Sequence, residues 1–133
     1  HWIIVSRLEL TGLKIIGLKI IQITDEMAAE HYAEHSERPF YAGLVAFITS
    51  GPVVAMAVSG PNAVAHVRRL MGATNPQDAA PGTIRGDLAT DIGRNVVHGS
   101  ANVEDGEREL PIFFEESEII TYHRANGPWI IEP

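Results

Sequence analysis

The spacing of apolar and polar residues changes several times along the chain, which predicts helices alternating with strands. Apolar residues three and four positions apart predict helices over residues 3–11, 25–35, 42–49, 61–71 and 103–110. Segments rich in β-branched residues predict strands over residues 13–23, 53–58 and 95–97. The long connections between these strands favour an α/β or α+β fold in which helices pack on a sheet.

Individual residues mark the ends and bends of these elements. Gly17 predicts a bend in the first strand, because glycine inside a strand often marks an irregularity. Thr24 and Asn102 each suit the position just before a helix, where their side chains can accept a backbone hydrogen bond. Pro61 suits the first turn of a helix. The continuous apolar run over residues 53–58 predicts a strand at the centre of a sheet.

The segment from residue 73 to residue 93 has no clear period and contains several glycines and prolines. A loop of that length in a compact protein is suspected of carrying function. Arg85 lies within it, between two glycines, and the strand predicted after it ends at His98. Strand ends and the loops beyond them are common places for functional side chains. The sequence thus raises the question of whether Arg85 and His98 bind the same anion.

Composition narrows the class of protein. A chain of 133 residues that is 45% hydrophobic and 20% charged is typical of one globular domain, covering residues 1–133. The formal charge of −7 argues against nucleic acid as the main partner. No apolar run is long enough to predict a membrane span, and the absence of cysteine from the sequence fits a cytoplasmic protein.

Four motifs, in a fixed order, resemble one known family. Asn95-Val96-Val97-His98-Gly99-Ser100 resembles the Asn-x-x-His-Gly-Ser signature of the nucleoside diphosphate kinases. The other matching segments are residues 50–56, 73–76 and 81–87. The resemblance runs from about Ile4 to Trp129 and implies an α+β, ferredoxin-like βαββαβ fold, an antiparallel sheet with helices packed on it.

The start of the chain departs from that family. Members begin with a strand and a Lys-Pro-Asp-Gly motif, whereas this chain opens with His1-Trp2-Ile3 and matches only from the first helix onward. The resemblance therefore predicts a single domain that is truncated at its N-terminus relative to the family, with the first strand missing or replaced. Because that strand is interior to the family's sheet, its absence would leave an open edge.

The resemblance also assigns catalytic roles. It makes His98 the nucleophile that becomes phosphorylated, because a neutral imidazole can attack a phosphorus atom. Glu109 would orient His98, with Ser100 nearby, and Tyr32 would line the pocket beside the histidine. Outside this set of motifs, His98 would be a structural histidine at a strand end, and Glu109 a solvated charge on a helix.

Further residues match the family's nucleotide-binding positions. Phosphate contacts fall to Arg68, Thr74 and Arg85, since arginine offers paired donors to phosphate oxygens. Phe40 would stack on the base, Asn95 would contact the ribose, and Leu44 and Ile92 would form apolar walls. Read without the resemblance, Phe40 could be a core residue and Arg68 a surface charge.

The resemblance implies Mg²⁺ as cofactor, held mainly by phosphate oxygens and water. No protein metal cage is predicted, and His31 and His35 are expected to be surface histidines. The expected partners are nucleoside triphosphates, with ATP as donor, and nucleoside diphosphates, and the expected assembly is a homo-oligomer, a tetramer or hexamer built from dimers. Two alternatives stay open: an impaired homologue that binds a nucleotide or a protein, and a small α+β interaction domain without a ligand.

Overall fold

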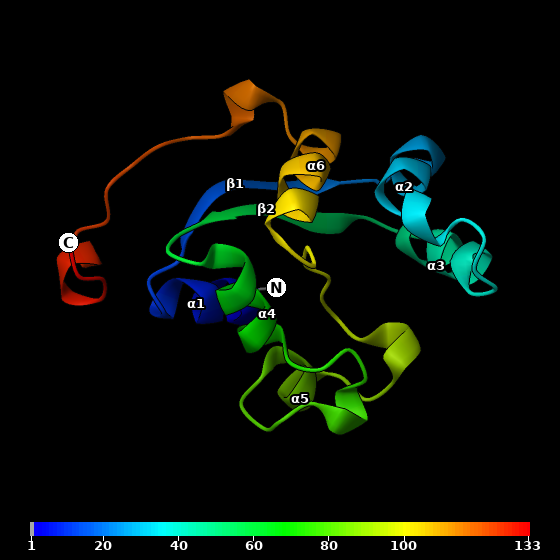
Figure 1. Ribbon diagram of the computed structural model, residues 1–133, viewed down its shortest axis with the longest axis horizontal. Helices are drawn as coiled ribbons and strands as arrows, with labels where there is room; N and C mark the ends of the chain where they lie inside the picture. Colours follow the sequence, from blue (N-terminus) through cyan, green and yellow to red (C-terminus); the bar gives the residue numbers. More distant parts are fainter. Residues whose placement is uncertain (1) are drawn as a thin grey trace.

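The computed structural model describes residues 2–133 as six α-helices packed around a two-stranded antiparallel sheet (Figure 1). The strands are β1 (Lys14–Ile21) and β2 (Val53–Ser59). The helices are α1 (Trp2–Leu10), α2 (Asp25–His31), α3 (Tyr41–Ile48), α4 (Ala63–Met71), α5 (Ile84–Leu88) and α6 (Val103–Phe113). Short 3₁₀ turns lie between several of them.

The predicted bend in the first strand is confirmed. β1 pairs with β2 from Lys14 opposite Ser59 to Ile21 opposite Val53, and the register shifts between Ile15 and Gly17. A Cβ atom on Gly17 would lie 3.0 Å from the ring of Phe114, so glycine allows the strand to pass close to the end of α6.

Two predictions about the sheet are wrong. Within residues 2–133, β2 pairs with β1 on one side and with no strand on the other, so it is not a central strand. Residues 95–97 form no strand: Val96 has a φ of 73°, and the backbone N–H of Val97 donates to the carbonyl of Asn95. The β-branched residues favour extended backbone, but the described part of the chain places no strand beside them to accept their hydrogen bonds.

Three boundaries also differ from the prediction. The helix predicted over residues 25–35 ends at His31 and continues as a 3₁₀ turn, although Thr24 caps it as expected. α4 begins after Asn62, so Pro61 lies outside its first turn. The segment predicted as irregular contains α5, which the hydroxyl of Thr83 caps by accepting from the N–H of Gly86.

The helices pack against one another as well as against the sheet. α6 crosses the sheet and contacts α2 at one end, while α1 contacts β1 and α4 (Figure 1). The buried apolar residues come from α1, α2, β2, α4, α5 and the connecting segments, and include Leu8, Leu13, Ile23, Ala28, Ala57, Met71, Ile84 and Phe114. None of the helices in residues 2–133 is long and apolar enough to cross a membrane.

The chain after α6 runs back along β1. The N–H of Ile120 donates to the carbonyl of Ile16 at 2.9 Å, and the hydroxyl of Tyr122 donates to the carbonyl of Ile15 at 2.8 Å. Farther on, the guanidinium of Arg124 donates to the carbonyl of Leu13 at 3.0 Å. These contacts fix the C-terminal segment to the outer side of β1.

Candidate active site

His98 lies on the turn-rich segment between α5 and α6, and hydrogen bonds from Arg85 hold that segment in place. The guanidinium of Arg85 donates to the carbonyl of Val97 at 2.7 Å and to the carbonyl of Gly72 at 3.2 Å. Arg85 is only 4% exposed, so these bonds form away from bulk water. Arg85 therefore positions the residue next to His98, and two of its donors bind backbone oxygens.

Glu109 and Ser100 lie beside His98. The hydroxyl of Ser100 donates to Oε2 of Glu109 at 2.7 Å, linking the segment that carries His98 to α6. Asn102 begins that helix by accepting a hydrogen bond from the N–H of Asp105. The cap fixes where α6 starts, and two helical turns later Glu109 faces back toward His98.

Aromatic rings from α2 surround the histidine on its other side. The His31 and His98 rings meet edge to face, with centroids 4.8 Å apart, and the Tyr32 ring is 5.8 Å from His98. His31 also contacts Phe113 of α6 at 5.1 Å. Burial, followed by the charge of Glu109, raises the pKa of Tyr32 to about 12, so its hydroxyl is protonated at neutral pH.

The surroundings of His98 hold its imidazole neutral. Its pKa is lowered to about 4: desolvation by the crowded side of the ring is the largest cause, His31 and the positive charges of Arg85 and Arg68 act in the same direction, and Glu109 opposes them. The other side of the residue is exposed, so solvent and a ligand can reach the ring. A neutral imidazole keeps a lone pair available for nucleophilic attack.

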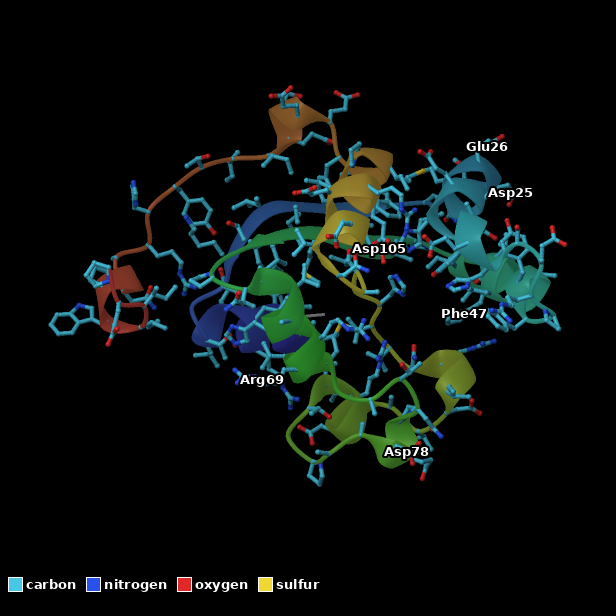
Figure 2. All side chains as sticks on the ribbon, viewed as in Figure 1. Asp25, Glu26, Phe47, Arg69, Asp78 and Asp105 are labelled. Atoms are coloured by element: carbon cyan, nitrogen blue, oxygen red, sulfur yellow. The ribbon has the colours of Figure 1, made fainter. Side chains whose placement is uncertain are left out.

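The residues matched to nucleotide contacts lie on both sides of this centre. The side-chain amide of Asn95 donates to the carbonyl of Thr74 at 3.0 Å, which brings two of them together. The guanidinium of Arg94 stacks 3.9 Å from the ring centroid of Phe47, so the turn that carries Ile92 is held against α3. Phe47 is labelled in Figure 2.

Phe40 and Ile92 are 56% and 57% exposed, respectively. Phe40 precedes α3, and Leu44 lies half-buried on it. Arg68 is exposed on α4, close enough to His98 and Arg85 for its charge to affect both pKa values. Phe40 and Ile92 are therefore open to solvent, and Arg68 is linked to His98 through its charge.

Sequence reasoning missed His31 as part of this centre. It was expected at the surface, yet it is 8% exposed and its Nδ1 atom lies 4.0 Å from Oε1 of Glu109. The prediction that Tyr32 lines the pocket was the available signal, because both residues lie at the end of α2. Arg108 was also missed; its guanidinium is 3.5 Å from the same carboxylate oxygen.

Comparisons with known proteins agree on one family. The family model for nucleoside diphosphate kinase matches residues 3–119. The nucleoside diphosphate kinase of Archaeoglobus fulgidus is 55% identical over 129 residues, covering 97% of this chain and 85% of that protein. The Thermus thermophilus enzyme is 58% identical over 117 residues, covering 88% of this chain and 85% of that protein.

Solved structures give the same result. A halophilic nucleoside diphosphate kinase from Halobacterium salinarum, in complex with CDP, has a TM-score of 0.94 at 51% identity, covering 98% of this chain and 88% of that one. A nucleoside diphosphate kinase family protein from Babesia bovis has a TM-score of 0.93 at 40% identity. The chain therefore belongs to the nucleoside diphosphate kinase family, and its predicted α+β, ferredoxin-like fold class is confirmed.

Proposed function

We propose that this protein transfers the γ-phosphate of a nucleoside triphosphate to a nucleoside diphosphate through a phosphohistidine on His98. The observation that carries the proposal is a neutral imidazole beside a carboxylate, in a region where Arg68 and Arg85 supply positive charge. CDP bound to the Halobacterium relative supports a nucleotide as the ligand.

The reaction proceeds in two halves. One ring nitrogen of His98 attacks the γ-phosphorus of the donor, a P–N bond forms, and the bond to the bridging oxygen breaks so that the nucleoside diphosphate leaves with the electron pair. A terminal phosphate oxygen of the acceptor then attacks the same phosphorus, and the ring nitrogen recovers its lone pair. Glu109 and Ser100 hold the imidazole in the orientation that attack requires.

Mg²⁺ is expected to bind mainly to the nucleotide. Among residues 2–133, the one group of three potential metal ligands contributes two imidazole nitrogens, whereas Mg²⁺ prefers oxygen ligands. Bound to the phosphates, the ion would neutralise part of their negative charge. The positive charges of Arg68 and Arg85 would act in the same direction from the protein side.

Intact-mass measurement after incubation with ATP and Mg²⁺ tests this proposal. We expect an acid-labile gain of one phosphoryl group, lost when a nucleoside diphosphate is added and absent in His98→Ala. The matched control His123→Ala changes an exposed histidine of the C-terminal segment and should keep the gain.

Circular dichroism of each variant would establish that it is folded. A folded wild-type chain that gains no phosphoryl group would contradict the proposal and favour a nucleotide-binding homologue without activity. A gain that persists in His98→Ala would place the chemistry on another residue.

A further inference from the structure

Three metal-ligating side chains from separate parts of the chain converge beside the sheet. His31 comes from the end of α2, His98 from the segment before α6, and Glu109 from within α6. One ligand atom from each lies within 4.8 Å of those of the other two. Two helices and the Arg85-supported segment thus hold the three groups together.

The strongest sign of an absent ligand is the Nδ1 atom of His31. The His31 side chain is only 6% exposed, and its buried Nδ1 atom has no hydrogen-bond partner among the described residues. Buried polar atoms normally have a partner, because losing water without replacement costs free energy. The Glu109 carboxylate, 4.0 Å away, is too distant for a hydrogen bond but suitable as a second ligand of a shared ion.

We propose that His31, His98 and Glu109 form a binding site for a divalent transition metal ion of the Zn²⁺ class. Two imidazoles and one carboxylate are a donor set that Zn²⁺ accepts, with a fourth position open to water or an anion. Mg²⁺ is disfavoured because it takes oxygen ligands in an octahedron. The ligand atoms must move inward by about 1 Å to reach Zn²⁺ at about 2 Å each, which the solvent-exposed His98 permits.

A hydrogen bond to Glu109 supports a metal site formed by these three residues. The hydroxyl of Ser100 holds the carboxylate of Glu109, the kind of outer contact that orients metal ligands. One neighbour opposes a cation: the guanidinium of Arg108 lies 3.5 Å from Oε1 of Glu109.

Occupation of this site would compete with the reaction proposed above. His98 uses a ring lone pair either to bind the metal or to attack phosphorus, so a bound metal ion would keep the histidine unphosphorylated. This consequence rests on the proposed function, whereas metal binding itself does not. The metal would then act as a reversible inhibitor.

Titration calorimetry of the untagged chain with Zn²⁺ at pH 7 is the first test. We expect one ion per chain, and affinity reduced more than about tenfold in His31→Phe, which keeps an aromatic ring but removes the ligand. His123→Phe, at an exposed histidine outside the site, should bind like the wild type. Arg108→Gln should bind several-fold more tightly, since a repelling charge is gone.

Two results would overturn the metal site: no one-to-one binding by a folded wild-type chain, or equal affinity in wild type and His31→Phe. Visible absorption of the Co²⁺-loaded protein, typical of tetrahedral sites, should appear in the wild type and vanish in His31→Phe. Zn²⁺ should block the phosphoryl gain, and a Zn²⁺-selective chelator should restore it. A chain that binds Zn²⁺ but gains no phosphoryl group without it would contradict the proposed function and leave the metal site standing.

Discussion

The carboxylate of Glu109 has several neighbours and only two oxygens. Ser100 donates to one oxygen, while the guanidinium of Arg108 and Nδ1 of His31 approach the other at 3.5 Å and 4.0 Å. The Ser100 contact is the only one of the three at hydrogen-bond distance. Ser100 therefore has the largest single effect on the orientation of Glu109, and through it on His98.

Ser100→Ala should slow phosphorylation of His98 by about tenfold, because a hydrogen bond to a charged group contributes about 1.5 kcal/mol. Quenched-flow measurement of phosphohistidine formation would give the rate. Ser117→Ala, at an exposed serine in the turn after α6, is the matched control and should leave the rate unchanged. An unchanged rate in Ser100→Ala would mean that Glu109 is positioned by other contacts.

The lowered pKa of His98 predicts the pH dependence of its phosphorylation. The groups that act on it are His31, Glu109, Arg85 and Arg68. An ordinary histidine is half protonated at about pH 6.5, and only the neutral half can act as a nucleophile. Here the neutral form persists as the pH falls, so the rate should stay level from about pH 8 to about pH 5.5 and decline only toward pH 4. A midpoint near 6.5 in single-turnover experiments would contradict the shift.

The same shift has a consequence for stability. Between the folded pKa and the unfolded value of 6.5, the unfolded chain binds more protons at His98 and His31 than the folded chain does. Stability from these two residues is therefore complete above pH 6.5 and is lost at lower pH, for His98 as the pH falls toward its folded pKa of about 4. Urea unfolding of wild type and His31→Phe should show a weaker loss over this range in the variant, and equal losses would argue against a neutral His31.

At the scale of elements, Arg85 joins three segments of the chain. It comes from α5 and binds the backbone after α4 and the backbone before His98. Its burial was not predictable, because an arginine among glycines is more often exposed or bound to an anion. The glycine that follows Arg85 also has a structural role. A Cβ on Gly86 would collide with the carbonyl of Ala80, so glycine at this position allows the two segments to pack closely.

Arg85→Ala should destabilise the protein by about 2–4 kcal/mol, since the carbonyls of Gly72 and Val97 would lose a charged donor away from water. Arg69→Ala, on the exposed side of α4, should change stability by less than about 0.5 kcal/mol (Figure 2). Urea denaturation measures both. Equal stability of Arg85→Ala and wild type would show that these hydrogen bonds contribute nothing net.

Most elements were predictable because local signals decide them. Thr24 and Asn102 cap helices as expected, and apolar spacing located α1, α3 and α6. The structure of residues 95–97 was not predictable, because a strand needs a neighbouring strand and β-branched residues alone do not supply one. The family resemblance predicted that His98, Ser100 and Glu109 lie together, whereas His31 could not be placed, since nothing in its own helix shows which carboxylate it faces.

At the scale of the whole molecule, apolar side chains gather on one surface. Trp2 is 77%, Ile20 75% and Leu18 47% exposed, and the three line one shallow hollow with Val5, Val54 and Lys19. Apolar patches of this kind often mark contacts between proteins. They fit the expectation, based on the family resemblance, that the protein is a homo-oligomer.

Ile20→Lys should reduce the mass of the assembly, because burying an unpaired ammonium in an apolar interface is unfavourable. Sedimentation velocity at several concentrations would measure that mass. Ile120→Lys changes an isoleucine of the C-terminal segment that is 57% exposed and should leave the assembly intact. A wild type that sediments as a monomer, or a variant with unchanged mass, would contradict an interface at this surface.

The C-terminal segment makes the two borders of the sheet unequal. It covers the outer side of β1, whereas the far side of β2 has no neighbouring strand within residues 2–133. Unpaired strand borders are templates on which other extended chains add, including those of a growing aggregate. Aggregation of this chain should therefore proceed in one direction, by addition of strands to β2. A short peptide with the β1 sequence, supplied in excess, should bind to β2 and stop that growth.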